Sequence, residues 1–230
     1  MANSARNQPG AEPVTMEENI NPMDNVQVFY EKNKKPISTI TTIVLVAVVG
    51  YFGYKLYKGP AEEKAASKLA IPQMLFQADS LNMALNGDSK NPGFIKIAKQ
   101  YEGTAAGNLA LYFEGACYLK MGNYKDAIKA LESFDGKGTT VAYEAWGALG
   151  EAYMESGNSA KAIENFKKAT ADKDNTLLTP LYLYQLGMAY ATTGNVNDAK
   201  AAFRRVRDEY PRSMQARDMD KELARLGDIN

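Results

Sequence analysis

The stretch that decides the fold is WGALGEAY at residues 146–153, because the chain repeats its pattern twice. The pattern occurs as LYFEGACY at residues 111–118 and as LYQLGMAY at residues 183–190, each with glycine fifth and tyrosine eighth. Self-similarity at a fixed period is the signature of stacked structural repeats, in which no single unit buries its own apolar face. The three copies therefore predict an elongated stack of similar units.

Each copy is followed by the same short pattern of residues. A Gly-Asn step comes first, then an alanine, and four residues later a large apolar side chain. Glycine ends a helix well because it adopts the left-handed conformation that satisfies the last carbonyl groups. We therefore expect each unit to be a helix, a tight turn and a second helix. The steps begin at Gly122, Gly157 and Gly194; the alanines are Ala127, Ala162 and Ala199; the apolar residues are Leu131, Phe166 and Phe203.

The glycines inside the three copies, Gly115, Gly150 and Gly187, predict close contact between helices. A glycine within a helix costs about 1 kcal/mol relative to alanine. Three glycines at the same position of the repeat indicate that the second helix of each unit lies too close to the first to leave room for a side chain there. The alanines of the second helices would serve the same purpose from the other side.

This pattern resembles the tetratricopeptide repeat, a 34-residue helix–turn–helix unit with the motif W-x2-L-G-x2-Y, then A-x3-F, then P. The resemblance implies an all-α fold: an α-solenoid of three repeats with a C-terminal capping helix over residues 108–227. We expect the capping helix to begin at Ser213 and end at Leu226. The middle copy matches the motif at Trp146, Leu149, Gly150, Tyr153, Ala162, Phe166 and Ala169.

Residues 61–107 are expected to form a degenerate repeat ahead of the three. The segment from Ala61 to Leu85 predicts one long helix, kinked or restarted at Pro72 and ended by the turn that begins at Asn86. Its partner covers residues 93–101, where Phe94, Ile97, Ala98 and Tyr101 share one face of a helix.

An apolar run, ISTITTIVLVAVVGYFGY, precedes the repeats at residues 37–54 and has no charged residue between Lys35 and Lys55. As a helix it would be roughly 28 Å long, close to the thickness of a bilayer core. We expect a single transmembrane helix over residues 37–57 (Ile37–Tyr57). A cleaved signal peptide is the alternative, but the run starts late and no small-residue cleavage site follows. A buried core helix is disfavoured by the length and the flanking lysines.

Residues 1–36 are predicted to be a disordered tail with a short juxtamembrane segment. The first 24 residues are too polar to form a core. Residues 25–33 carry Val26, Phe29 and Tyr30 at helical spacing, which predicts a short helix at the membrane interface. Three lysines flank the span on one side and four on the other, so charge alone leaves its orientation open.

Composition argues against catalytic, metal-binding and nucleic-acid-binding sites. The chain has zero net charge, no histidine and one cysteine, Cys117, so we expect no nucleic-acid binding, no metal site, no cofactor and no disulfide. Cys117 should be a small buried apolar residue. Glu144, Glu151 and Glu155 recur at helical spacing; a solvated face explains them more simply than a catalytic pair. The sequence therefore predicts a binding protein and not an enzyme.

The repeat resemblance also implies a partner-binding groove along the first helices of the units. It is expected to be apolar and aromatic at its ends and acidic in the middle, which suits protein segments with aliphatic and basic residues. Some of these side chains could instead pack against the neighbouring repeat. The candidate residues are Leu109, Tyr112, Leu119, Lys120, Glu144, Glu151, Met154, Glu155, Leu181, Tyr184 and Met188.

The order of tail, lysine cluster, span and repeats resembles the YfgM-type ancillary subunits of the bacterial SecYEG translocon. Residues 28–33, 50–55 and 103–110 are similar to that family's juxtamembrane segments and entry into the repeats. The resemblance implies an inner-membrane adaptor or chaperone-like protein with a cytoplasmic N-terminus and a periplasmic repeat domain. Its implied partners are the Sec translocon and a membrane-anchored periplasmic chaperone. An envelope scaffold for cell division or outer-membrane assembly is the alternative.

Overall fold

The computed structural model describes residues 22–228, which form two compact units, one up to Lys55 and the other from Leu56 onward. The tail predicted to be disordered lies outside the described residues as far as residue 21. The described part contains helices and no β-strand, apart from an isolated bridge between Gly87 and Pro92. The all-α prediction is confirmed for these residues.

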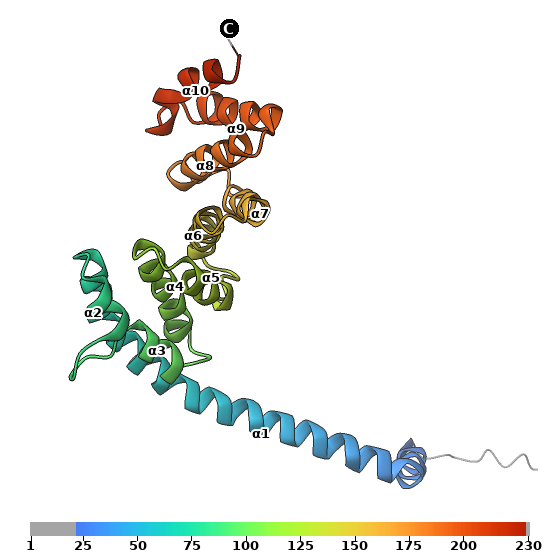
Figure 1. Ribbon diagram of the computed structural model, residues 1–230. Helices are drawn as coiled ribbons and strands as arrows, with labels where there is room; N and C mark the ends of the chain where they lie inside the picture. Colours follow the sequence, from blue (N-terminus) through green and yellow to red (C-terminus); the bar gives the residue numbers. More distant parts are fainter. Residues whose placement is uncertain (1–21, 229–230) are drawn as a thin grey trace, which may run out of the picture. The chain divides into compact units, whose positions relative to one another are not determined.

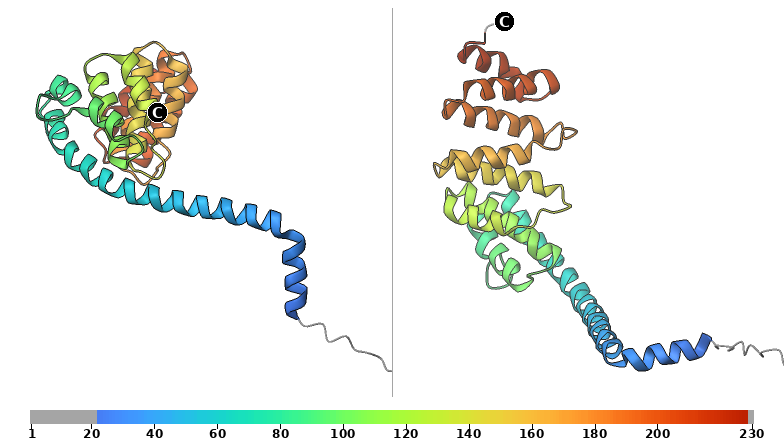
Figure 2. Two further views of the ribbon diagram at one scale, coloured as in Figure 1. Left: turned by 90° about the horizontal axis from the view of Figure 1, so that it is seen from below. Right: turned by 90° about the vertical axis from the view of Figure 1, so that its right-hand side faces the viewer.

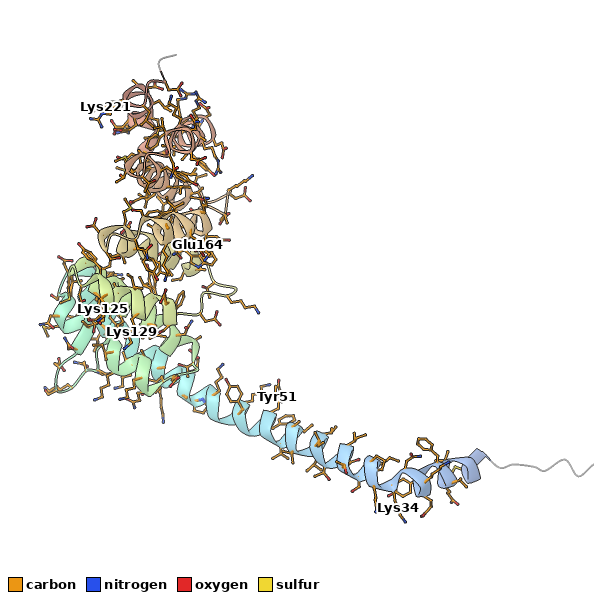
Figure 3. All side chains as sticks on the ribbon, turned by 45° about the vertical axis from the view of Figure 1, so that its right-hand side comes forward. Lys34, Tyr51, Lys125, Lys129, Glu164 and Lys221 are labelled. Atoms are coloured by element: carbon orange, nitrogen blue, oxygen red, sulfur yellow. The ribbon has the colours of Figure 1, made fainter. Side chains whose placement is uncertain are left out.

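Helix α1, Pro22–Gln77, is 56 residues long and runs from the first unit into the second. In the first unit its apolar side chains are exposed, and Figure 3 shows Lys34 and Tyr51 projecting outward from it. Figure 2 shows its first turns, in the darkest blue, at an angle to the next ones. Pro36 explains such a bend, because it lacks the amide that would continue the hydrogen-bond ladder.

The second unit is a stack of antiparallel helix pairs (Figure 1). We call α4, α6 and α8 the first helices and α5, α7 and α9 the second helices. The bounds are α2 Leu81–Asn86, α3 Phe94–Gln100, α4 Ala105–Lys120, α5 Tyr124–Ser133, α6 Val141–Glu155, α7 Ser159–Ala169, α8 Leu178–Thr192, α9 Val196–Glu209, the 3-10 helix Gln215–Asp218 and α10 Met219–Arg225.

The turn within each helix pair is the one that the Gly-Asn steps predict. Gly157 has a φ of 80°, and its amide donates to the carbonyl of Met154 at 3.0 Å. The amide of Asn158 donates to the carbonyl of Tyr153 at 2.8 Å, which completes a Schellman motif. Gly122 and Gly194 form turns of the same type in the other two pairs, and Gly227 forms another after α10.

The glycines inside the first helices lie where the second helices contact them. A Cβ on Gly115 would come within 3.0 Å of Leu131, and one on Gly150 or Gly187 equally close to the ring of Phe166 or Phe203. Ala127, Ala162 and Ala199 are fully buried on the second helices. The predicted close approach is confirmed in all three pairs.

The C-terminal half of α1 packs against α4 as the first helix of an additional pair. Ala65 and Leu69 share a core with Phe94, Ile97 and Cys117. At one end, Glu62 accepts hydrogen bonds from the first two amides of α4, at 2.6 and 2.8 Å. At the other end, Asp79 pairs with Lys120 at 2.5 Å. The helix therefore runs parallel to α4.

Three predicted elements differ in the structure. The short helix expected over residues 25–33 is not a separate element, because α1 begins at Pro22 and continues through it into the apolar run. The helix expected over residues 61–85 is two helices, because α1 ends at Gln77 and Asp79 adopts a positive φ of 58° before α2. Pro72, by contrast, is buried inside α1 and causes no restart. The capping helix is also shorter than expected. Ser213 accepts a hydrogen bond from the amide of Ala216, but the turn that follows is a 3-10 helix and α10 begins at Met219.

Candidate partner-binding surface

The eleven candidate residues lie on the three first helices, four on α4, four on α6 and three on α8. We call this set the partner surface. Its members divide by exposure: Lys120, Glu155 and Met188 are exposed, and the other eight are half-buried. Four pockets of the second unit are lined by other residues. The partner surface is therefore a broad face and not an enclosed site.

Tyr112 and Glu144 join the first helices of neighbouring repeats. The hydroxyl of Tyr112 on α4 donates to Glu144 Oε2 on α6 at 2.8 Å. Burial, together with the charge of Glu144, raises the pKa of Tyr112 above its ordinary value. The tyrosine therefore stays protonated and serves as a hydrogen-bond donor that fixes the carboxylate.

Glu151 forms the corresponding link between α6 and α8. Its Oε1 accepts a hydrogen bond from Gln185 Nε2 at 2.9 Å. Burial raises the pKa of the Glu151 carboxyl, and the nearby charge of Glu155 adds to the effect. Beside it, the ring of Tyr182 fills the space where a Cβ on Gly147 would lie. A partly buried carboxylate, which forms no ion pair with any residue that the structure describes, thus occupies the middle of the partner surface.

Lys120 is the one basic member of the partner surface, and it is already paired. Its Nζ lies 2.5 Å from Asp79 Oδ1 and 5.2 Å from the centre of the Phe76 ring. The three glutamates therefore determine the charge of the surface. The predicted acidic middle is present at the predicted residues, and whether a partner binds there stays a prediction.

The apolar members divide their surface between the core and solvent. Tyr112, Met154 and Leu181 pack against the buried cluster around Leu149 and Phe166, while Leu109 and Tyr184 pack against the neighbouring clusters. Met188 is 38% exposed. The alternative that some of these residues support the stack is therefore correct for those five residues, each of which also keeps part of its surface in solvent.

The described residues hold no group of three or more potential metal ligands. Cys117 is fully buried, and burial raises its pKa to about 12, so its thiol is not a nucleophile at neutral pH. Sequence reasoning missed Gln185, Tyr182 and Asp79. The pairing of Glu151 with a residue 34 positions later, about one repeat on, is the signal that could have found Gln185.

Comparison with protein families supports the repeat interpretation. Two family models, each described as a tetratricopeptide repeat, match residues 114–176 and 182–213. No curated protein matches the chain. The matched residues cover the three helix pairs except the first residues of α4 and of α8. The chain therefore carries tetratricopeptide repeats, a fold that typically serves as a non-catalytic scaffold for protein interaction.

Solved structures share the fold. The crystal structure of MamA protein is 21% identical, with a TM-score of 0.57, and the match covers 73% of this chain and 84% of MamA. The TPR-like repeats of a putative kinesin light chain from Podospora anserina are 16% identical, with a TM-score of 0.54, covering 74% and 87%. At these identities the similarity shows the fold alone.

Proposed function

We propose that the chain is a membrane-anchored adaptor that binds segments of other proteins on its partner surface. The observation that carries the proposal is the combination of tetratricopeptide repeats with one long apolar helix whose side chains are not buried. The repeats account for binding, and the helix accounts for attachment. No residue of the partner surface needs to perform chemistry in this function.

The anchor is supported by the apolar part of α1. Among the described residues this is the one helix long and apolar enough to cross a membrane; its most apolar window has a mean hydropathy of 1.8 and none of it is buried. The core helix of a soluble protein would be mostly buried instead. Ile43, Leu45 and Val49 each expose about three-fifths of their surface. Such a continuous apolar surface is stable in lipid and not in water.

The chemistry of the partner surface favours a particular kind of segment. Three glutamates lie between apolar and aromatic residues of α4 and α8, and the single lysine is neutralised by Asp79. Opposite charge steers association, and exposed aliphatic and aromatic groups supply contact area. We infer that the preferred segments combine basic with aliphatic residues.

Membrane attachment is tested by extraction of cell membranes. An anchored chain stays in the pellet after high salt and alkaline carbonate and is released by detergent. Replacing Val44, Val46 and Val48 with Lys should release it. Release of the unmodified chain by carbonate would contradict the anchor, whatever the repeats bind.

Partner binding is tested by charge reversal. The double variant Glu151→Lys with Glu155→Lys should weaken capture of bound proteins by about tenfold or more, because it reverses the charge of the partner surface. Asp198→Lys on the second helix α9 is the matched control and should leave capture unchanged. Equal capture by the two variants would show that partners bind elsewhere.

We further propose that the repeats face the periplasm and that the partners include the Sec translocon and a membrane-anchored periplasmic chaperone. The support is the resemblance of residues 28–33, 50–55 and 103–110 to YfgM-type subunits. Protease added to spheroplasts should digest the repeats from outside. Protection until lysis would reverse the topology, and copurification of division or outer-membrane assembly proteins instead would favour an envelope scaffold.

A further inference from the structure

The outer side of α1 in the repeat unit, away from α4, is apolar and exposed. Ala65 and Leu69 lie in the core that α1 shares with α4. On the opposite side of the helix, Met74 is 63% exposed and Ile71 is 39% exposed. The exposed residues of α10, at the other end of the stack, are mostly charged, and Figure 3 labels Lys221 among them. Because the end units of a stack need polar outer faces, the end formed by α1 is the one that needs a cover.

Two glycines of the apolar run have no role in the packing of the described chain. A Cβ on Gly50 or Gly53 would have no group from another part of that chain within 4 Å, whereas one on Gly115, Gly150 or Gly187 would collide with a neighbouring helix. Glycine is unfavourable within a helix relative to alanine. Inside a membrane, small residues let the backbones of two helices approach closely. Gly50 and Gly53 therefore indicate contact with a helix from another molecule.

The two glycines and the exposed apolar residues of α1 share one spacing. Alternate steps of three and four residues lead back from Met74 through Ile71 to Gly53 and Gly50. This period of 3.5 residues is that of a left-handed coiled coil, and most helix pairs in membranes cross with the same geometry. We call the residues at these positions the α1 seam: Ile43, Val46, Gly50, Gly53, Tyr57, Pro60, Lys64, Ser67, Ile71 and Met74.

The α1 seam is complementary to itself. Chains anchored by the same span enter the membrane in the same direction, so the α1 helices of two copies are parallel. About a twofold axis each residue then meets its own counterpart, and Gly50 and Gly53 face small residues on both helices. Lys64 occupies one position of the seam, and a single lysine there fixes the register and the number of helices in a coiled coil. These features favour a second copy of this chain over an unrelated helix.

We propose that two copies of the chain associate through the α1 seam within one membrane. The inference rests on the proposed membrane anchor and adds a partner for it. Gly50 and Gly53 give close contact inside the bilayer, and Ile71 and Met74 of the two copies cover each other outside it. The dimer holds two partner surfaces in one complex, so a partner with two suitable segments binds more tightly than a partner with one.

Disulfide crosslinking of the intact chain in liposomes tests the seam. Cys117 is fully buried, so a cysteine introduced on the exposed side of α1 is the one that reacts. Met74→Cys should crosslink two copies under mild oxidation. Ala66→Cys is the matched control, because Ala66 is also exposed on α1 but lies roughly a third of a turn from the middle of the seam. We expect Met74→Cys to crosslink about tenfold faster or more.

Gly53→Ile checks the contact inside the bilayer. Added to Met74→Cys, it should lower crosslinking by about tenfold or more, because the helices can no longer approach closely. Val48→Phe is the control: it also adds four carbon atoms to the apolar run, but on a side of the helix away from Gly53, and it should leave crosslinking unchanged. Diluting the chain tenfold with lipid should leave most of the Met74→Cys dimer in place.

Four results would overturn the proposal. Equal crosslinking of the two cysteine variants, or crosslinking that survives Gly53→Ile, would show that the seam is not the contact. Crosslinking that falls in proportion to dilution would show chance collision. Crosslinks in cell membranes to a different protein, in place of a second copy, would assign the seam to that protein. Carbonate extraction judges the anchor separately: a chain that stays in the pellet without crosslinking keeps the anchor and loses the dimer, and a chain released by carbonate loses both.

Discussion

The absence of a single Cβ atom decides how closely the two helices of a repeat approach each other. Gly150 leaves room for the ring of Phe166, which is fully buried, and Gly187 does the same for Phe203. In the first repeat the partner is Leu131. A glycine that is unfavourable for the helix is therefore favourable for the pair, because a large apolar side chain is buried in its place.

Gly150→Ala should destabilise the protein by roughly 1–2 kcal/mol. The added methyl group would lie 2.5 Å from the ring of Phe166 and force it to move, at a cost in the upper part of the usual range, roughly 2–3 kcal/mol. The better helix propensity of alanine returns about 1 kcal/mol. The free energy of unfolding measured with denaturant checks this. Ala148→Gly, at a half-buried position of the same helix, gives an upper limit for the propensity contribution, because it also removes a methyl group that packs against the core. A Gly150→Ala variant as stable as the original protein would contradict the packing.

Glu151→Gln should stabilise the protein at neutral pH, on the order of 0.5 kcal/mol, because the carboxylate is partly desolvated and lies near Glu155. The pKa of Glu151 is raised in the folded state. The folded protein therefore holds this proton more tightly, and stability is lost as pH rises from about 4.3, the ordinary value, through the raised one. The advantage of the variant should vanish at lower pH. Thermal unfolding at several pH values measures this; an advantage that persists in acid would refute the cause.

At the residue scale, the residues that recur at the same position of every repeat could be predicted from the sequence, and those that occur in one repeat alone could not. Gly150, Ala162 and Phe166 were predictable because three copies carry the same steric requirement. Gln185 was missed because its contact joins two repeats and no local pattern encodes it.

Helix α1 shows how one element supports another. The carboxylate of Glu62 accepts bonds from the amides of Ala105 and Ala106, the first residues of α4. The first amides of a helix have no partner within it, and the N-terminus favours negative charge. An anion supplied by a different helix therefore completes the start of α4 and ties the additional pair to the three repeats.

Glu62→Ala should weaken this junction by about 1–2 kcal/mol. The amides of Ala105 and Ala106 should exchange hydrogen faster, because they lose their acceptor. Glu63→Ala, at the exposed neighbouring position, is the matched control and should leave both amides protected. Unchanged exchange in Glu62→Ala would indicate that the cap does not persist in solution.

The elements that the sequence placed wrongly lack a local signal. Between Gln77 and Ser80 there is no glycine or proline, yet Asp79 adopts a left-handed conformation and the chain turns. Tertiary contacts favour the turn, since Asp79 reaches Lys120 and Phe76 packs edge-on against Phe113. Pro72 has the strongest local breaking signal and ends nothing, because burial against the repeats compensates for the lost hydrogen bond.

Across the repeat unit, stability comes from contacts between neighbours. The buried residues form three clusters along the stack, with Leu149 in the middle one and Leu223 in the last. Units that contact only their neighbours behave as a one-dimensional array, in which the loss of a central unit weakens both sides and the loss of an end unit weakens one.

Leu149→Ala should therefore lower hydrogen-exchange protection from α5 to α8, at a cost of roughly 2–4 kcal/mol. Leu223→Ala should lower protection in α9 and α10 and leave α4 unaffected. Exchange measured helix by helix separates these patterns. A uniform loss in both variants would mean that the unit unfolds in one step and that the array description fails.

The residues of the partner surface could be predicted from the sequence only because the chain resembles a known repeat. Periodicity identifies which residues face the core, but the choice among the remaining faces depends on how the helix pairs stack. Glu144 and Glu151 show the limit: their spacing suggested a solvated face, whereas both are half-buried, Glu144 accepting a hydrogen bond from the preceding repeat and Glu151 from the following one. Such links join residues about one repeat apart.

The buried thiol of Cys117 has a practical consequence for spectroscopy. The chain has no other cysteine, and this one is sealed in the core with a pKa raised to about 12, so maleimide reagents cannot reach it in the folded protein. A cysteine introduced at any exposed position would be the only site to label. With two such cysteines, a pair of spin labels or fluorophores could be attached, and distances along the stack measured without altering the native residue.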